Sequence, residues 1–238
     1  KGLSFKEAID YGASWAGLSQ AEGGPLHLPQ TKQQKLISQE PKEEDLEKDK
    51  QVRIQKAKAL WDKGQAIQGS LAERYLREHR KIEGNLPSDL RYLPHFKVYS
   101  RENGQSGDKS AQSYPCLMAA ARSSKGEITA IQLTFLNPTT ATKADLSVTK
   151  RSFGVLKGSA GTLQEEKNSN VFFVAEGVET ALSLKEAGVK GTIKATLGLS
   201  NIKRLTPENS LNESSLNENS KAQIVVCADH DPSDSPAT

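Results

Sequence analysis

Two apolar runs that end in acidic residues place the strongest constraint on the fold. They are VFFVAEG at 171–177 and AQIVVCADHD at 222–231. Between them lie two short helical patterns, at 179–188 and 199–205, and a further strand-like run at 191–198. Strands that are apolar on both faces and alternate with helices are typical of a buried parallel sheet with βαβ crossovers. The sequence therefore predicts an α/β fold for this part of the chain.

The acidic residues after these runs point to a metal site. Glu176 follows the first run, and Asp229 and Asp231 follow the second. Ligands of open parallel sheets bind beyond the carboxyl ends of the strands, so three carboxylates meet at one edge if the two strands are neighbours. Mg²⁺ prefers such oxygen ligands and supports phosphoryl transfer. From the residues alone, the alternative is that each acid merely caps a helix.

The chain before residue 170 has a different pattern. A capping-box helix is expected at 3–17, followed by a Gly- and Pro-rich linker and by a mixed-charge run at 38–50, so we place a boundary near residue 50. Helical spacing begins at Val52, and a second capping box, Ser70 with Glu73, begins a helix. Strand-like segments follow, of which the last two are joined by a Ser-Ser-Lys-Gly turn: 90–99, 114–122 and 127–136. The pattern in the middle of the chain therefore predicts a small α+β unit.

Composition excludes several classes of protein. No apolar run approaches the roughly 20 residues that span a bilayer, and no secretory leader is visible, so we expect a cytoplasmic protein without a membrane partner. The chain begins with Lys1, and we expect it to be a piece of a longer protein. The two cysteines form no C-x-x-C pair, and no P-loop motif is present. The net charge of +3 is too small to indicate nucleic-acid binding by itself.

The motif EGVETALSL (176–184), followed some fifty residues later by VVCADHD (225–231), resembles the Toprim domain of bacterial primases, topoisomerases and related nucleases. The residue sequence EGVETAL is most similar to the corresponding motif of primase-like Toprim proteins of phages, plasmids and conjugative elements. The resemblance covers roughly residues 52–231. It implies a Rossmann-like parallel Toprim sheet, incomplete at its C-terminus because a last helix and strand are missing, preceded by a small α+β primase-core region.

The resemblance also implies a division of the chain into four parts. They are the tail of an upstream zinc-binding module (1–18), a charged linker (19–51), the α+β region (52–165) and the C-terminally truncated Toprim domain (170–238).

Roles for individual residues follow from the same resemblance. Glu176 is implied as the catalytic acid-base or metal-associated carboxylate, and Asp229 and Asp231 as ligands of Mg²⁺ or Mn²⁺. Gly177 would permit a close approach of the backbone. Glu179 is a further candidate, although cellular primases carry their second acid one position later.

A basic stretch between residues 120 and 160 fits this reading. Lys143, Lys150 and Arg151 are candidates for contacts with nucleic-acid or nucleotide phosphates, and the alternative is an ordinary solvated basic face. Tyr92, Phe96 and Tyr99 have the residue type that stacks on bases, but strand-spaced aromatic residues more often form core.

We therefore expect a primase-like nucleotidyltransferase piece that performs Mg-dependent phosphoryl transfer on single-stranded DNA for a mobile genetic element. Its partners would be single-stranded DNA, nucleoside triphosphates, and a helicase or relaxase domain of the same parent protein. One alternative is a Toprim nuclease or a topoisomerase-type DNA enzyme. The other is an inactive nucleic-acid-binding remnant.

Overall fold

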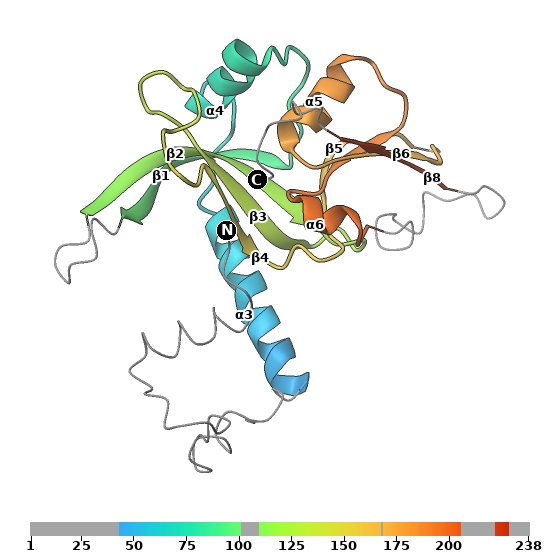
Figure 1. The fold of residues 1–238 in the computed structure, drawn as a ribbon, viewed down its shortest axis with the longest axis horizontal. Helices are drawn as coiled ribbons and strands as arrows, with labels where there is room; N and C mark the ends of the chain where they lie inside the picture. Colours follow the sequence, from blue (N-terminus) through green and yellow to red (C-terminus); the bar gives the residue numbers. More distant parts are fainter. Residues whose placement is uncertain (1–42, 101–109, 168, 206–221, 229–238) are drawn as a thin grey trace, which may run out of the picture. The chain divides into compact units, whose positions relative to one another are not determined.

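The computed structural model describes residues 43–100, 110–167, 169–205 and 222–228 (Figure 1). Contacts divide the chain into two compact units, 1–46 and 47–238, and the second unit contains both sheets. Several features of the sequence lie outside the described residues: the helix expected at 3–17, the Gly- and Pro-rich linker that follows it, the near-repeat SLNESSLNEN at 210–219, and the pair Asp229 and Asp231.

The first sheet has four strands in the order β1-β2-β3-β4, all antiparallel. They are β1 (Leu90–Ser100), β2 (Ser110–Arg122), β3 (Ile128–Phe135) and β4 (Lys150–Gly154). The predicted hairpin turn joins β2 to β3: the Gly126 amide donates to the Ser123 carbonyl, and Gly126 has a φ of 78°. Glycine adopts this left-handed conformation without a steric cost, which is why the turn ends on it.

The second sheet has four strands in the order β5-β7-β6-β8. They are β5 (Gly161–Gln164), β6 (Val171–Ala175), β7 (Thr192–Ala195) and β8 (Gln223–Cys227). Strand β6 pairs in parallel with both β7 and β8, whereas β5 is antiparallel to β7. Helices α5 (Val178–Glu186) and α6 (Leu199–Ile202) lie between the parallel strands in the sequence. The fold is thus mixed α/β, with antiparallel pairs in the majority, and the sequence pattern does not predict β4 or β5.

Within the described residues, three helical segments precede the first sheet. Helix α3 (Glu43–Trp61) begins with acidic residues that suit a helix N-terminus and buries Ile54, Ala57 and Trp61. It therefore starts within the charged run, earlier than Val52. Helix α4 (Leu71–Arg74) is capped as predicted, because Ser70 Oγ accepts a hydrogen bond from the Glu73 amide. The chain then continues as a π-helical turn, η1 (Tyr75–His79), where the sequence pattern predicts a regular α-helix.

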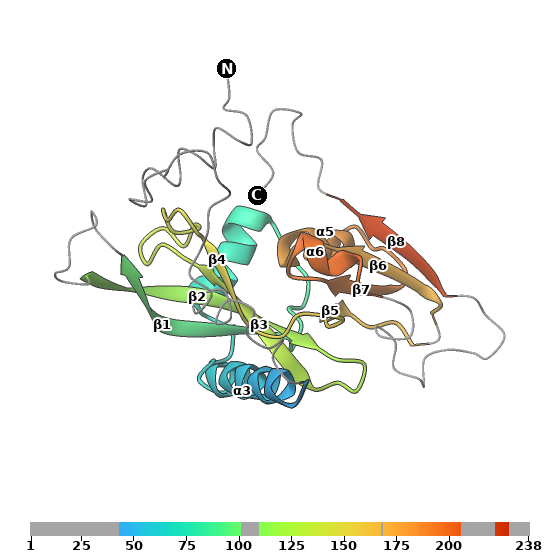
Figure 2. The ribbon, with the colours of Figure 1, turned by 60° about the horizontal axis from the view of Figure 1, so that its bottom comes forward.

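Two apolar clusters cover the two faces of the first sheet. Helix α3 packs on one face through Ala57 and Trp61 (Figure 2). The opposite face packs against η1 and against the second sheet with α5, in a cluster that includes Tyr75, Leu117 and Ile193. Within the part of the chain that the structure describes, no helix combines the length and apolar character needed to cross a bilayer.

Candidate nucleotide site at the end of strand β6

Glu176 is the residue that directly follows β6, at the carboxyl end of the parallel strands. Strand β6 pairs with β8 so that Ala175 lies opposite Cys227, the last residue of β8. The two strands are thus hydrogen-bonded neighbours, which is the condition under which the residues after them would meet at one edge of the sheet. Glu176 follows one paired position, and the sequence continues from the other through Ala228 to Asp229.

The backbone of Glu176 is fixed by the turn that follows β7. Its carbonyl accepts a hydrogen bond of 2.9 Å from the Leu197 amide. Leu197 has a φ of 60°, a left-handed conformation that is uncommon for leucine. The Leu197 carbonyl in turn accepts a hydrogen bond of 2.8 Å from Gln132 Nε2 of β3. Strain of this kind persists where surrounding contacts impose it, so the first sheet helps to set the position of Glu176.

Three side chains converge on Glu179, in the first turn of α5. Lys150 Nζ lies 3.0 Å from Glu179 Oε2, and Lys143 Nζ lies 3.4 Å from Oε1. The Tyr75 hydroxyl donates to Oε1 at 2.9 Å and itself accepts a hydrogen bond of 2.9 Å from Arg80 Nε. We call Lys143, Lys150 and Glu179 the lysine–glutamate cluster.

The electrostatics of the cluster keep Glu179 ionised. Burial alone would raise the pKa of its carboxyl, but the attraction of Lys150 and Lys143 is stronger in sum and lowers the pKa to about 2. The pKa of Lys143 lies below its usual value because burial disfavours its ammonium, an effect that Glu179 opposes. Two ammonium groups therefore share a single carboxylate, and the cluster carries a net positive charge.

The cluster lies beside Glu176–Gly177. A Cβ atom built on Gly177 would stand 3.7 Å from Lys150 Nζ and 3.4 Å from Glu179 Oε2, both ordinary contact distances. Gly177 has a φ of −108° and a ψ of 158°, which suit any residue. The described atoms therefore do not themselves require a glycine here.

Arg151 is not brought together with the two lysines. Successive residues of a strand point to opposite faces, so Arg151 faces away from Lys150. Its guanidinium lies 5.7 Å from the centroid of the Phe135 ring, in the cluster that packs against α3.

The three candidate stacking aromatics have separate environments. Phe96 packs against Phe135 and Phe153 and is part of the core. Tyr92 is partly buried against the other apolar cluster, whereas Tyr99 is 57% exposed. Of the three, Tyr99 alone presents most of its ring to solvent.

The described residues supply one carboxylate, Glu176, to the predicted magnesium site. No group of three or more His, Cys, Asp or Glu side chains gathers around a possible ion within the described ranges. Asp229 and Asp231 lie outside those ranges. A carboxylate oxygen is a suitable ligand for Mg²⁺, so Glu176, the one predicted ligand among the described residues, fits this ion.

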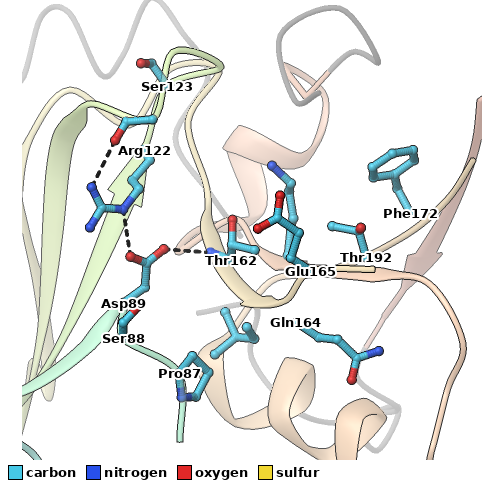
Figure 3. A pocket seen from close by; sticks show the side chains of 13 residues that line it. Pro87, Ser88, Asp89, Arg122, Ser123, Thr162, Gln164, Glu165, Phe172 and Thr192 are labelled. Atoms are coloured by element: carbon cyan, nitrogen blue, oxygen red, sulfur yellow. Dashed lines mark hydrogen bonds and ion pairs between the residues drawn. The ribbon is translucent and has the colours of Figure 1, made fainter. Parts of the chain in front are cut away.

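A separate pocket of about 350 Å³ lies between the first sheet and strands β5 and β7. Figure 3 shows Asp89 between Arg122, which donates to it from Nε at 2.7 Å, and the Thr162 amide at 3.1 Å. The pocket lining includes Phe172 near the start of β6 and Lys194 of β7, which pairs with Val174. The pocket contains none of the predicted site residues.

Comparison with known proteins assigns a family description to the first half of the second unit. Residues 51–163 match the family model described as a domain of unknown function (DUF7146). The matched segment includes the first sheet with Lys143 and Lys150, and it ends before β6. No curated protein and no solved structure matches the chain.

Two residues of the site are not predicted from the sequence, Tyr75 and Gln132. The Tyr75 hydroxyl contacts a residue 104 positions away, and Gln132 contacts one 65 positions away. Tyr75 fits the buried face of a helix, and Gln132 is one polar residue in an apolar strand. The sequence signal for Gln132 is its place in an otherwise apolar strand, because a buried side-chain amide needs hydrogen-bond partners.

Proposed function

We propose that the chain is a Toprim-type, primase-like nucleotidyltransferase piece, which joins nucleotides on single-stranded DNA with the help of Mg²⁺. The observation that carries this proposal is the parallel pairing of β6 with β8, in the register Ala175 opposite Cys227. With this register, Glu176 and the Asp-His-Asp sequence at 229–231 follow neighbouring strands at one edge of the sheet, where ligands of open α/β sheets bind.

The chemistry of nucleotide transfer suits this arrangement. The 3′ oxygen of one nucleotide bonds to the α-phosphorus of the next, the bond to pyrophosphate breaks, and the 3′ hydroxyl loses its proton. Mg²⁺, when bound, would neutralise charge on the transferring phosphoryl group. In this proposal Glu176, Asp229 and Asp231 would hold the ion, or Glu176 would instead take the proton as the acid-base group.

The lysine–glutamate cluster supports the assignment of a phosphate substrate. The Lys150 ammonium lies next to Gly177, the residue after Glu176, and Lys143 pairs with the same Glu179 carboxylate, so two positive charges are opposed by one negative charge. Fixed positive charge beside a site where negative charge builds on a leaving group favours transfer. In this proposal Lys143 and Lys150 contact the nucleotide phosphates, and Arg151, which faces away, does not.

The test is nucleotide incorporation on single-stranded DNA with Mg²⁺, with nucleoside triphosphates as substrates. We expect primer products from the chain, and we expect them to be lost in Asp229→Ala and Asp231→Ala. Asp62→Ala, at an exposed acid just after α3, is the matched control and should retain activity. Cutting of the template that depends on Asp229 and Asp231, without primer products, would replace the primase proposal with a nuclease. Absence of both activities in folded protein would contradict it.

A further inference from the structure

We propose that Glu179 is a positioning residue that holds Lys143 and Lys150 as a seat for one phosphate group beside Glu176. This inference rests on the proposed function, because the seat is part of the same site. It concerns a residue that does not itself contact the substrate and acts through the two lysines.

The first support is the geometry of the ion pairs. Each lysine contacts a different oxygen of the same carboxylate, Lys150 at 3.0 Å and Lys143 at 3.4 Å. Without the carboxylate, two ammonium groups this close would repel each other. Each ammonium has three N–H donors, so pairing with one carboxylate oxygen leaves further donors that can bind a phosphate.

The second support is the burial gradient across the cluster. The Glu179 side chain is 13% exposed, whereas those of Lys143 and Lys150 are 34% and 30% exposed. The Glu179 side chain is therefore the most buried of the three, and the lysine side chains are the ones that solvent, and a phosphate in it, can reach. Displacing a buried carboxylate from its partners would be costly, so an arriving phosphate joins the cluster without replacing Glu179.

The third support is that Glu179 is itself held from a different element. The Tyr75 hydroxyl of η1 donates to it at 2.9 Å, and Arg80 donates to Tyr75. At the other end of α5, Glu186 accepts hydrogen bonds from the amides of Glu83 and Gly84, at 3.1 and 2.8 Å. Both ends of α5 are thus attached to the segment that begins with η1, so Glu179 has a fixed place relative to the lysines.

The experiment measures binding of inorganic tripolyphosphate to the 238-residue chain by calorimetry, with EDTA present so that no metal contributes. We expect Glu179→Gln to weaken binding about tenfold, because the lysines lose the charge that holds them together. Glu127→Gln makes the same change of charge at an exposed position in the turn between β2 and β3, and it should leave binding unchanged. Lys143→Ala with Lys150→Ala should abolish it, while Lys190→Ala, at an exposed lysine, should not.

Dependence on pH separates positioning from a merely structural role. The groups that face Lys143 are Glu179 of α5, Lys150 of β4 and Arg80 after η1. Glu179 is the one that favours the charged form of Lys143, so its neutralisation lowers the pKa of that lysine further. Tripolyphosphate binding by Glu179→Gln should therefore decline at a lower pH than binding by the unaltered chain, while the melting temperatures at neutral pH indicate whether each protein is folded.

Each outcome decides the inference. Equal or tighter binding by folded Glu179→Gln overturns it, as does a failure of the unaltered chain to bind tripolyphosphate. If Glu179→Gln does not fold, Glu179→Asp decides, since its shorter carboxylate cannot reach both lysines: weaker binding supports the seat, and unchanged binding overturns it. Glu179-dependent binding without nucleotide incorporation would keep the seat and remove the primase. Nucleotide incorporation together with tripolyphosphate binding that does not depend on Glu179 would keep the primase proposal and overturn the role of Glu179.

Discussion

The phenol of Tyr75 donates a hydrogen bond of 2.9 Å to the carboxylate of Glu179, a residue 104 positions further along the chain. Burial, together with the nearby Glu179 carboxylate, raises the pKa of Tyr75, so the phenol keeps the proton that it donates. This bond joins the π-helical turn η1 to α5, the helix that starts directly after Glu176–Gly177. Turns of π-helix are frequent at functional sites, and here the turn carries the hydroxyl that reaches the cluster.

Replacing Tyr75 with Phe should therefore destabilise the protein. The change removes a hydrogen bond to a buried carboxylate and the acceptor of Arg80 Nε. We expect the free energy of unfolding to fall by about 1–2 kcal/mol, measured by urea denaturation. Tyr99→Phe is the control, because the side chain of Tyr99 is exposed, and it should change the free energy by less than about 0.5 kcal/mol. Equal effects of the two changes would contradict this role of the Tyr75 hydroxyl.

Asp89→Asn should destabilise the contact between the two sheets. The Asp89 side chain is 7% exposed, and its two oxygens accept hydrogen bonds from Arg122 of β2 and the Thr162 amide of β5. An asparagine has one carbonyl oxygen and so cannot accept both bonds in the same way. We expect a loss of about 2–3 kcal/mol in the free energy of unfolding, because both bonds involve a charged group.

The control for this change is Asp62→Asn, at an exposed position after α3, which should be nearly neutral. If both variants unfold at the same urea concentration as the unaltered chain, Asp89 does not hold the sheets together.

Regular elements with local signals are predicted well from this sequence. The capping box at Ser70 and the hairpin turn that ends on Gly126 are both present, because each depends on residues within four positions of one another. Strands β6 and β8 are also predicted from their apolar runs, but only β6 is largely buried: β8 lies at the edge of its sheet, and Val226 is exposed.

Features that depend on distant contacts are not predicted. Strand β4 has only five residues, and their burial does not alternate, so the sequence gives no clear strand pattern. The turn of π-helix at Tyr75–His79 has the spacing of an ordinary helix in sequence. The convergence of Lys143 and Lys150 on Glu179 requires the two sheets to be in place, so a basic stretch in the sequence indicates charge but not its partner.

Gly154→Ala should be severely destabilising. Gly154 has a φ of 94°, and a Cβ atom there would lie 2.3 Å from the Thr129 carbonyl oxygen and 3.0 Å from Ala57 of α3. Backbone cannot move away as a flexible side chain can, so we expect a loss of about 3 kcal/mol or more in thermal or urea unfolding.

Gly126→Ala separates the two causes of this loss. Gly126 has a similar φ of 78°, but a Cβ atom there would meet nothing within 4 Å. The free energy of unfolding of Gly126→Ala should fall only by the cost of placing alanine in a left-handed conformation, about 1 kcal/mol. A Gly154→Ala variant no less stable than Gly126→Ala would show that β3 and α3 can move away from β4 freely at this point.

The ionisation of Glu179 should make part of the stability dependent on pH. Lys150 and Lys143, acting against the effect of burial, lower the pKa of Glu179 in the folded protein from its usual 4.5 to about 2. A carboxyl whose pKa is lower in the folded than in the unfolded state stabilises the fold above its unfolded pKa, and this contribution is lost as the pH falls toward the folded pKa. Its full size corresponds to about 3 kcal/mol, at about 1.4 kcal/mol for each unit of pKa.

The unaltered chain should therefore lose stability between about pH 5 and pH 2, and Glu179→Gln should lose less over the same interval. Urea denaturation at a series of pH values measures both curves. Glu127→Gln is the control: Glu127 is exposed in the turn between β2 and β3, away from the two lysines, so its neutralisation should leave most of the decline in place. Parallel curves for Glu179→Gln and the unaltered chain would mean that the two lysines do not stabilise the ionised carboxyl, and the electrostatic basis of the cluster would be wrong.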